Sequence, residues 1–155
     1  MEQVSRVCMG GTFDILHVGH EALLTRAANE GKRVLIGLTT DERASRGRNA
    51  DNLNPYIIRK QNLENLLSNL GFLEKFEIVP LKNDWGPSVI DEDFGAIIVS
   101  EETRNTAEKI NKIRIKGGKS ELKIVVVPMI KSVDGKYISS SRIRDKVIDS
   151  EGNLT

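Results

Sequence analysis

The sequence predicts an α/β fold, namely a single Rossmann-like doubly wound domain with a five-stranded parallel sheet. Two observations support this prediction. Short apolar runs alternate along the chain with segments of helical period, as expected for parallel strands covered by helices. The polar motifs fall just after such a run or at the start of a helical segment, where open parallel sheets bind ligands. The 155 residues suffice for one domain, which we expect over residues 1–155.

The expected strands are short runs rich in β-branched residues and leucine. No linker, repeat or low-complexity tract interrupts their alternation with helical segments. The expected strands are Val4–Met9, Val34–Leu38, Phe76–Leu81, Ala96–Val99 and Ile124–Val127.

Helical segments fill the intervals between these runs. Glycines follow several of them, because glycine readily takes the backbone conformations that stop a helix. In the second segment, Asn54 is expected to be the N-cap and Pro55 the first helical residue. In the third, Glu101 and Glu102 are expected in the first turn, where they interact favourably with the helix dipole. The expected segments run from His20 to Gly31, from Asn54 to Gly71, from Glu101 to Gly117 and onward from Ser139.

The composition is that of an ordinary globular protein, with 39% hydrophobic and 29% charged residues. The net charge of +1 provides no global field that would draw the chain to nucleic acid or to a membrane. Cys8 is the single cysteine, which excludes an intrachain disulfide and a cysteine-built metal site. No apolar segment resembles a signal peptide or could span a bilayer, so we expect a cytoplasmic protein.

The most informative segment is Gly10–His20, where the first apolar run gives way to a helical pattern. Gly10 and Gly11 permit a tight turn that approaches a ligand closely. The N-terminus of the following helix offers unpaired N–H groups to an anion. His17 and His20 could both face one bound triphosphate and stabilise charge that develops on phosphorus. The segment predicts chemistry on a nucleotide; the alternative is a glycine turn beside two polar histidines.

A second motif, Ile138–Arg144, opens the last expected helix. With Ser139 as the N-cap, Ile138 and Ile143 have the spacing of a hydrophobic staple. Three serines at a helix N-terminus, followed by two arginines, form a suitable cradle for phosphate oxygens. The alternative is a well-capped surface helix.

The first segment resembles the Gly-x-Phe-Asp-x-x-His-x-Gly-His fingerprint of the nucleotidyltransferase superfamily. The second resembles the Ile-Ser-Ser-Thr-x-Ile-Arg element of the phosphopantetheine adenylyltransferases, with Ser141 in the place of threonine. Residues 99–103 resemble the Val-Ser-Glu-Glu-Thr element of the archaeal and eukaryotic type of that family, and residues 37–42 resemble its second-strand ending. Residues 84–87 resemble its Asp-x-Tyr-Gly-Pro loop, with Trp85 in the place of tyrosine. The residues that follow the superfamily fingerprint are Thr12, Phe13, Asp14, His17, Gly19 and His20.

This resemblance implies that ATP and 4′-phosphopantetheine react to give dephospho-coenzyme A and pyrophosphate. The acceptor phosphate is already ionised at neutral pH, so in-line attack needs neither a general base nor a covalent intermediate. The resemblance implies Mg²⁺ bound through the ATP phosphates. No carboxylate cluster in the sequence looks like a dedicated metal site, so we expect no metal ligand on the protein. From the net charge we expect no nucleic-acid or membrane partner, and the sequence predicts no oligomeric state.

The resemblance also implies the residues of the site. His17, His20 and Thr12 would be catalytic, and Asp14 would cap or orient the turn. The implied ATP-binding residues are Gly11, Thr12, Phe13, His17, Gly19, His20, Ser100, Glu101, Glu102, Thr103, Ile138, Ser139, Ser140 and Ser141. The implied acceptor-binding residues are Thr12, Arg46, Arg48, Arg59 and Trp85.

Several of these assignments have open alternatives. Family members usually have a phosphate-contacting lysine after the second strand; this chain has none there, so the role would pass to Arg46 or Arg48. Residues 41–54 could instead be a mobile surface loop. Arg59 could form a surface ion pair with Glu64 or a neighbour, and Trp85 could anchor its loop to the core.

Two other functions compete with this one. Another small nucleotidyltransferase, acting on flavin mononucleotide or glycerol 3-phosphate, shares the first motif. Cytidylyltransferases tend to carry Arg-Thr-x-Gly-Ile-Ser-Thr-Thr near the second site, whereas this chain has Gly-Lys-Tyr-Ile-Ser-Ser-Ser over residues 135–141. A non-catalytic nucleotide-binding module is the alternative from another class, and the presence of both histidines argues against it.

Overall fold

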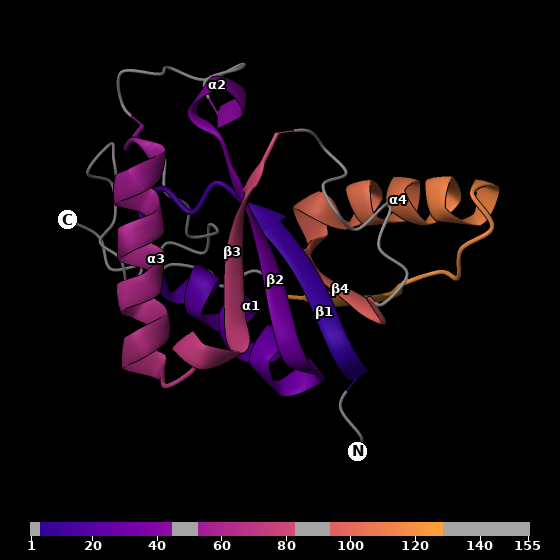
Figure 1. Ribbon diagram of the computed structural model, residues 1–155, viewed down its shortest axis with the longest axis horizontal. Helices are drawn as coiled ribbons and strands as arrows, with labels where there is room; N and C mark the ends of the chain where they lie inside the picture. The colour runs from indigo at the N-terminus through magenta and orange to yellow at the C-terminus, as the bar shows by residue number, and fades with distance from the viewer. Residues whose placement is uncertain (1–3, 45–52, 83–93, 129–155) are drawn as a thin grey trace.

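The computed structural model describes residues 4–44, 53–82 and 94–128 (Figure 1). Their centre is a sheet of five parallel strands in the order β3-β2-β1-β4-β5. This order confirms the predicted doubly wound α/β fold. The strands are β1 (Val4–Gly11), β2 (Gly31–Thr39), β3 (Phe76–Leu81), β4 (Ala96–Ser100) and β5 (Lys123–Val127).

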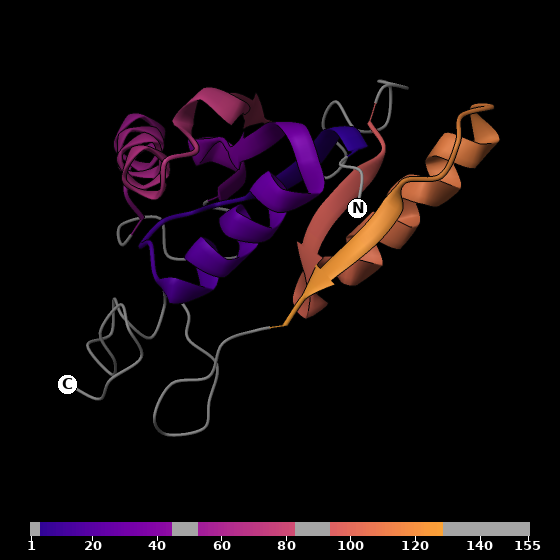
Figure 2. The same cartoon turned by 90° about the horizontal axis from the view of Figure 1, so that it is seen from below.

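Helices cover both faces of the sheet. Figure 2 shows α1 and α4 on opposite sides of β4 and β5. The helices are α1 (Val18–Glu30), the short α2 (Asp41–Ala44), α3 (Tyr56–Leu70) and α4 (Arg104–Lys116), with 3-10 turns η2 (Leu73–Lys75) and η4 (Glu101–Thr103). None of these helices in the described ranges is long and apolar enough to cross a membrane.

Alternate residues of each central strand enter two separate cores, as the pleat of a strand requires. In β1, Val7 and Met9 face one core and Cys8 faces the other. The first core lies under α1 and α3, and it includes Leu24, Ala27, Leu63 and Leu67. The second lies under α4, and it includes Ala107 and Ile110. Because both faces of β1, β2 and β4 are covered, these strands read as continuous apolar runs.

The chain winds in opposite directions from the middle of the sheet. β1 pairs with β2 on one side and with β4 on the other, through Val7–Ala96 and Cys8–Ile97. The carboxyl ends of β1 and β4 therefore lie at the point where strand order reverses. Parallel α/β sheets bind ligands at this point, just beyond the strand ends.

Two expected helix starts are wrong in detail. Pro55, and not Asn54, is the N-cap of α3, and no side chain of that cap accepts a helix N–H group. Glu101 and Glu102 lie in the 3-10 turn η4, which precedes α4. Gly31 follows α1 as expected, although its backbone is extended because it already begins β2. The helix expected from Ser139 lies outside the described residues.

Removing the Leu63 side chain should destabilise the fold. Leu63 on α3 is fully buried in the first core, whereas Ile57 on the same helix is 68% exposed. We expect Leu63→Ala to lower the free energy of unfolding by about 2–5 kcal/mol. Ile57→Ala, the matched control, should change it by less than about 0.5 kcal/mol. Denaturant unfolding measures both; equal effects would contradict the described packing of α3.

Candidate functional site

The turn between β1 and α1 has an unusual backbone at Phe13. Its φ of +47° lies in the left-handed region, which residues with a side chain rarely adopt. The Phe13 ring is buried and packs against Gly11, where an added Cβ would lie 2.9 Å from ring atom Cε2. Burial of this ring holds the strained turn in place, and Gly11 leaves room for it.

Both histidines of the turn bind backbone N–H groups at the start of α1. His17 is the N-cap, and its Nδ1 accepts from the N–H of Gly19 at 3.1 Å. Nδ1 of His20 accepts from the N–H of His17 at 3.3 Å. The two bonds have the reciprocal pattern of a capping box. Gly19 permits this arrangement, since an added Cβ would lie 2.8 Å from His17 Cε1.

These hydrogen bonds fix the tautomer of each imidazole. A neutral ring whose Nδ1 accepts a proton carries its own hydrogen on Nε2. His17 and His20 therefore each retain an Nε2–H donor. Their rings are stacked, with centroids 3.9 Å apart. The His20 ring also contacts the Phe13 ring, and these two ring centroids are 5.1 Å apart. The turn thus supplies two donors beside each other at a helix N-terminus, which is a favourable place for an anion.

Burial keeps both histidines neutral. It lowers the pKa of His17 from 6.5 to about 4. For His20, burial is again the largest cause, and the nearby His17 adds to it while Asp14 opposes it, so that the pKa falls to about 3. At neutral pH neither ring carries a charge. Both can donate a hydrogen bond without taking up or releasing a proton.

The end of β4 forms a second turn close to the first. Ser100 and Gly11 each lie three positions beyond the paired residues Ile97 and Cys8 on adjacent strands. The Ser100 N–H donates to Thr103 Oγ1 at 3.1 Å, which holds η4 closed. Glu101 and Glu102 are exposed on this turn. The structure therefore brings this predicted nucleotide-binding segment to the same edge of the sheet as the histidines.

Arg59 lies beneath the turn and joins three segments. Its side chain is fully buried, and its Nη1 donates to the carbonyl oxygens of Thr12 at 3.0 Å and Thr39 at 2.7 Å. Its Nε donates to the carbonyl oxygen of Asn54 at 2.8 Å, and Nη2 donates to the Asp41 carboxylate at 2.8 Å. The alternative considered for Arg59, a surface ion pair with Glu64 or a neighbour, is wrong as to the surface, because the guanidinium is buried and pairs with Asp41. The predicted substrate contact of Arg59 stays a prediction.

Asp41 and Asp14 connect the same segments a second time. Oδ1 of Asp41 accepts from the N–H of Tyr56 at 2.7 Å, which satisfies the first donor of α3. Oδ1 of the buried Asp14 accepts from the N–H of Asn54 at 3.0 Å. Asp14 therefore orients the turn, as expected, through a partner 40 residues away. Thr39 adds a bond from its hydroxyl to the carbonyl oxygen of Gly11 at 3.0 Å.

Sequence reasoning missed the parts played by Asp41, Thr39 and Asn54. A carboxylate, a threonine and an asparagine just after a strand or before a helix are common, and nothing local identifies their partners. The one available signal was the position of Arg59, one turn into the helix that follows these residues. The remaining predicted site residues lie outside the described part of the chain: Arg46, Arg48, Trp85, Ile138, Ser139, Ser140 and Ser141.

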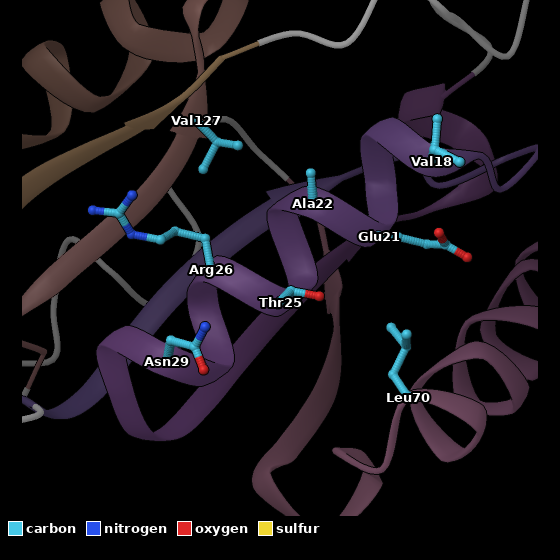
Figure 3. Close-up of a pocket in the computed structure, with 8 residues that line it drawn as sticks. All are labelled: Val18, Glu21, Ala22, Thr25, Arg26, Asn29, Leu70 and Val127. Atoms are coloured by element: carbon cyan, nitrogen blue, oxygen red, sulfur yellow. The ribbon is translucent and has the colours of Figure 1, made fainter. Parts of the chain in front are cut away.

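A surface hollow of about 550 Å³ lies along α1, and its lining begins at Val18, the residue after the N-cap His17. Figure 3 shows Glu21 and Arg26 leaving α1 in opposite directions on its border. Its wall also includes Leu70 at the end of α3 and Val127 at the end of β5. None of the residues that line it belongs to the predicted site.

The fold and the turn are those of a nucleotidyltransferase. Residues 8–146 match the family described as cytidylyltransferase-like, and the chain belongs to this family. Solved structures agree on the fold. A protein of unknown function from Archaeoglobus fulgidus is 36% identical, with a TM-score of 0.72, over 79% of this chain and 88% of that one. A bifunctional NMN adenylyltransferase/ADP ribose pyrophosphatase from Francisella tularensis is 15% identical, with a TM-score of 0.61, over 94% of this chain and 42% of that one.

Curated relatives narrow the family further. A phosphopantetheine adenylyltransferase of Methanopyrus kandleri is 41% identical over 92% of this chain and 90% of its own length. Those of Methanothermobacter thermautotrophicus and Methanosarcina mazei are 40% and 43% identical, over 97% and 96% of this chain and 89% and 96% of their own lengths. The chain is thus a member of the phosphopantetheine adenylyltransferase family, which confirms the resemblance inferred from its motifs.

The buried histidines should make stability depend on pH. The unfolded chain binds protons on both histidines below pH 6.5, whereas the folded chain does not until about pH 4 and about pH 3. The free energy of unfolding should therefore fall as the pH drops from 6.5 towards 4, and Tm with it. In His17→Asn the slope should be smaller, because asparagine caps a helix and does not titrate. Thermal unfolding at several pH values measures this; parallel curves for the two proteins would contradict it.

Proposed function

We propose that this protein transfers AMP from ATP to 4′-phosphopantetheine, giving dephospho-coenzyme A and pyrophosphate. The observation that carries the proposal is the pair of neutral histidines whose Nε2–H donors lie at the N-terminus of α1. The relatives named phosphopantetheine adenylyltransferase supply the substrates, since they match this chain over most of its length. The reaction belongs to coenzyme A biosynthesis.

In the proposed reaction, an oxygen of the acceptor phosphate attacks the α-phosphorus of ATP. A new phosphorus–oxygen bond forms as the bond to the β-phosphate breaks, and pyrophosphate leaves with the electron pair. The attacking phosphate is already ionised, so the protein has no proton to remove. Catalysis then consists of aligning two polyanions and stabilising the charge on the α-phosphoryl oxygens.

The histidines suit this task better as neutral donors than as acids. Two imidazolium ions with centroids 3.9 Å apart would repel each other, and burial would disfavour both. The neutral rings are fixed by backbone N–H groups, so no reorganisation is needed when charge develops. Thr12 would lie between the α-phosphate and the acceptor, and Gly11, Phe13 and Gly19 would bring backbone groups close to the triphosphate.

The other predicted contacts can be described from the adenine of ATP, through its phosphates, to the acceptor. Ser100–Thr103 would meet the adenine, and Ser139–Ser141 with Ile138 would hold the β- and γ-phosphates. Arg46 or Arg48 would bind the acceptor phosphate, and Trp85 would border the pantetheine arm. In the described ranges, no group of three or more histidine, cysteine or acidic side chains could hold a metal ion. We propose that Mg²⁺ enters on the ATP phosphates and that the reaction is cytoplasmic.

The substrate assignment is tested by pyrophosphate release. ATP and CTP are each combined with phosphopantetheine, flavin mononucleotide or glycerol phosphate in the presence of Mg²⁺. We expect turnover with ATP and phosphopantetheine. Turnover only with another pair would overturn the proposal, and absence of turnover with ATP binding retained would favour a non-catalytic module.

Removing one imidazole should reduce turnover and leave most nucleotide binding in place. We expect His17→Ala and His20→Ala each to lower kcat by about 100- to 1,000-fold, which is typical for one lost donor to a transition state. The KM for ATP should change far less. Lys109→Ala, on the exposed side of α4, is the control and should retain full kcat. Unchanged turnover in both histidine variants would remove them from the mechanism.

The pH profile separates neutral donors from general acids. With pKa values of about 4 and about 3, neither histidine changes its charge between pH 7 and 9. We expect kcat to stay level over this range. Below about pH 6 it should fall, because the acceptor phosphate gains a proton. A steady loss of kcat from pH 6.5 upward would show that a protonated imidazole is required.

A further inference from the structure

The buried guanidinium of Arg59 controls the orientation of one peptide group in the catalytic turn. Its Nη1 donates to the Thr12 carbonyl oxygen at 3.0 Å, and the peptide that carries this oxygen also carries the N–H of Phe13. None of the described peptide bonds is cis. In a planar trans peptide the C=O and N–H point in opposite directions. The Phe13 N–H is therefore turned away from Arg59.

The Phe13 N–H has no competing acceptor in the part of the chain that the structure describes. Within the described ranges, no hydrogen bond is made by the Phe13 N–H. The group lies in the same turn as Gly11, His17 and His20, at the carboxyl end of β1. Because φ of Phe13 is +47°, a relaxed backbone would rotate this peptide to another orientation. Two things oppose the rotation: the buried Phe13 ring, and the bond of Arg59 to the Thr12 oxygen.

We propose that Arg59 is a positioning residue, which holds the Thr12–Phe13 peptide so that the Phe13 N–H donates to the α-phosphoryl group during transfer. The proposal rests on the proposed function for its reaction. Arg59 does not touch the substrate in this role. It acts through the carbonyl oxygen of Thr12, and its bonds to Thr39, Asn54 and Asp41 fix the guanidinium itself.

Only arginine has the geometry for this task. Four donor–acceptor bonds leave the guanidinium in different directions within one plane, and two of them come from the same Nη1. A lysine keeps the charge but has a single side-chain nitrogen. That nitrogen cannot reach the carbonyl oxygens of Thr12 and Thr39 as well as Asn54 and Asp41. Asp41 supplies the opposite charge that a buried arginine requires.

The test compares Arg59→Met and Arg59→Lys with a buried arginine elsewhere. Arg114 on α4 is 1% exposed and donates to the Ser120 carbonyl oxygen at 2.8 Å, far from the turn, so Arg114→Met is the matched control. All variants are assayed for kcat and ATP KM at a temperature where thermal unfolding shows them folded. We expect Arg59→Met to lower kcat by about 100-fold, as for a reacting group displaced by about 1 Å. Arg59→Lys should show an intermediate loss, and Arg114→Met should lose stability with kcat retained.

A second readout does not depend on turnover. In the ¹⁵N-labelled wild-type protein, ATP should shift the amide resonance of Phe13. The shift should be lost in Arg59→Met, reduced in Arg59→Lys and kept in Arg114→Met. Should Arg59→Met fail to fold, Arg59→Lys decides in its place.

The outcomes separate this inference from the proposed function. Full kcat in Arg59→Lys, or no ATP-dependent shift of the Phe13 amide in the wild type, would overturn the positioning role while phosphopantetheine turnover could stand. Conversely, wild-type protein without phosphopantetheine turnover would overturn the proposed function. An ATP-dependent shift that requires Arg59 would then still support the positioning role for another nucleotide reaction.

Discussion

The buried guanidinium of Arg59 is the contact on which the active edge of the sheet depends. It binds carbonyl oxygens that follow or end two adjacent strands, and it joins them to the start of α3. Without Arg59, the buried Thr39 carbonyl oxygen would lose this partner, and an unsatisfied buried acceptor costs about 1–3 kcal/mol. The charge of Arg59 is in turn balanced by Asp41, which also caps α3. One side chain thus connects packing, charge balance and the shape of the turn.

Each histidine of the turn, like Arg59, serves more than one purpose with a single side chain. Each imidazole satisfies a backbone N–H at the start of α1 with one nitrogen and offers the other to a ligand. Capping and the proposed catalytic role therefore depend on the same tautomer, and burial maintains it by keeping the pKa of each histidine low. A proton on Nδ1 of His17 would break the cap and charge the ring together. This coupling is compatible with the proposed mechanism, in which the histidines do not change their protonation.

Much of the fold could be predicted because it follows from local patterns. The five strands appear as apolar runs, since the central ones are covered on both faces, and the histidine spacing follows from the helical period. What could not be predicted depends on distant partners. The N-cap of α3 was misplaced because its first donor is satisfied by Asp41, 15 residues earlier. The buried bonds of Arg59 could not be predicted because its partners lie up to 47 residues away. No local window contains these contacts.

The pairing of β1 with β4 has a consequence for how the two halves of the sheet stay together. Their register joins Val7–Ala96 and Cys8–Ile97, whereas β1 and β2 are paired along most of their length. The boundary between β1 and β4, here called the seam, therefore has fewer backbone pairings than the boundary between β1 and β2. It lies directly beneath the Gly11 and Ser100 turns. A nucleotide that contacts both turns would close this seam from above and add its binding free energy to the cohesion of the sheet. The bound substrate would then strengthen the cohesion between the two halves of the sheet in addition to its chemical role.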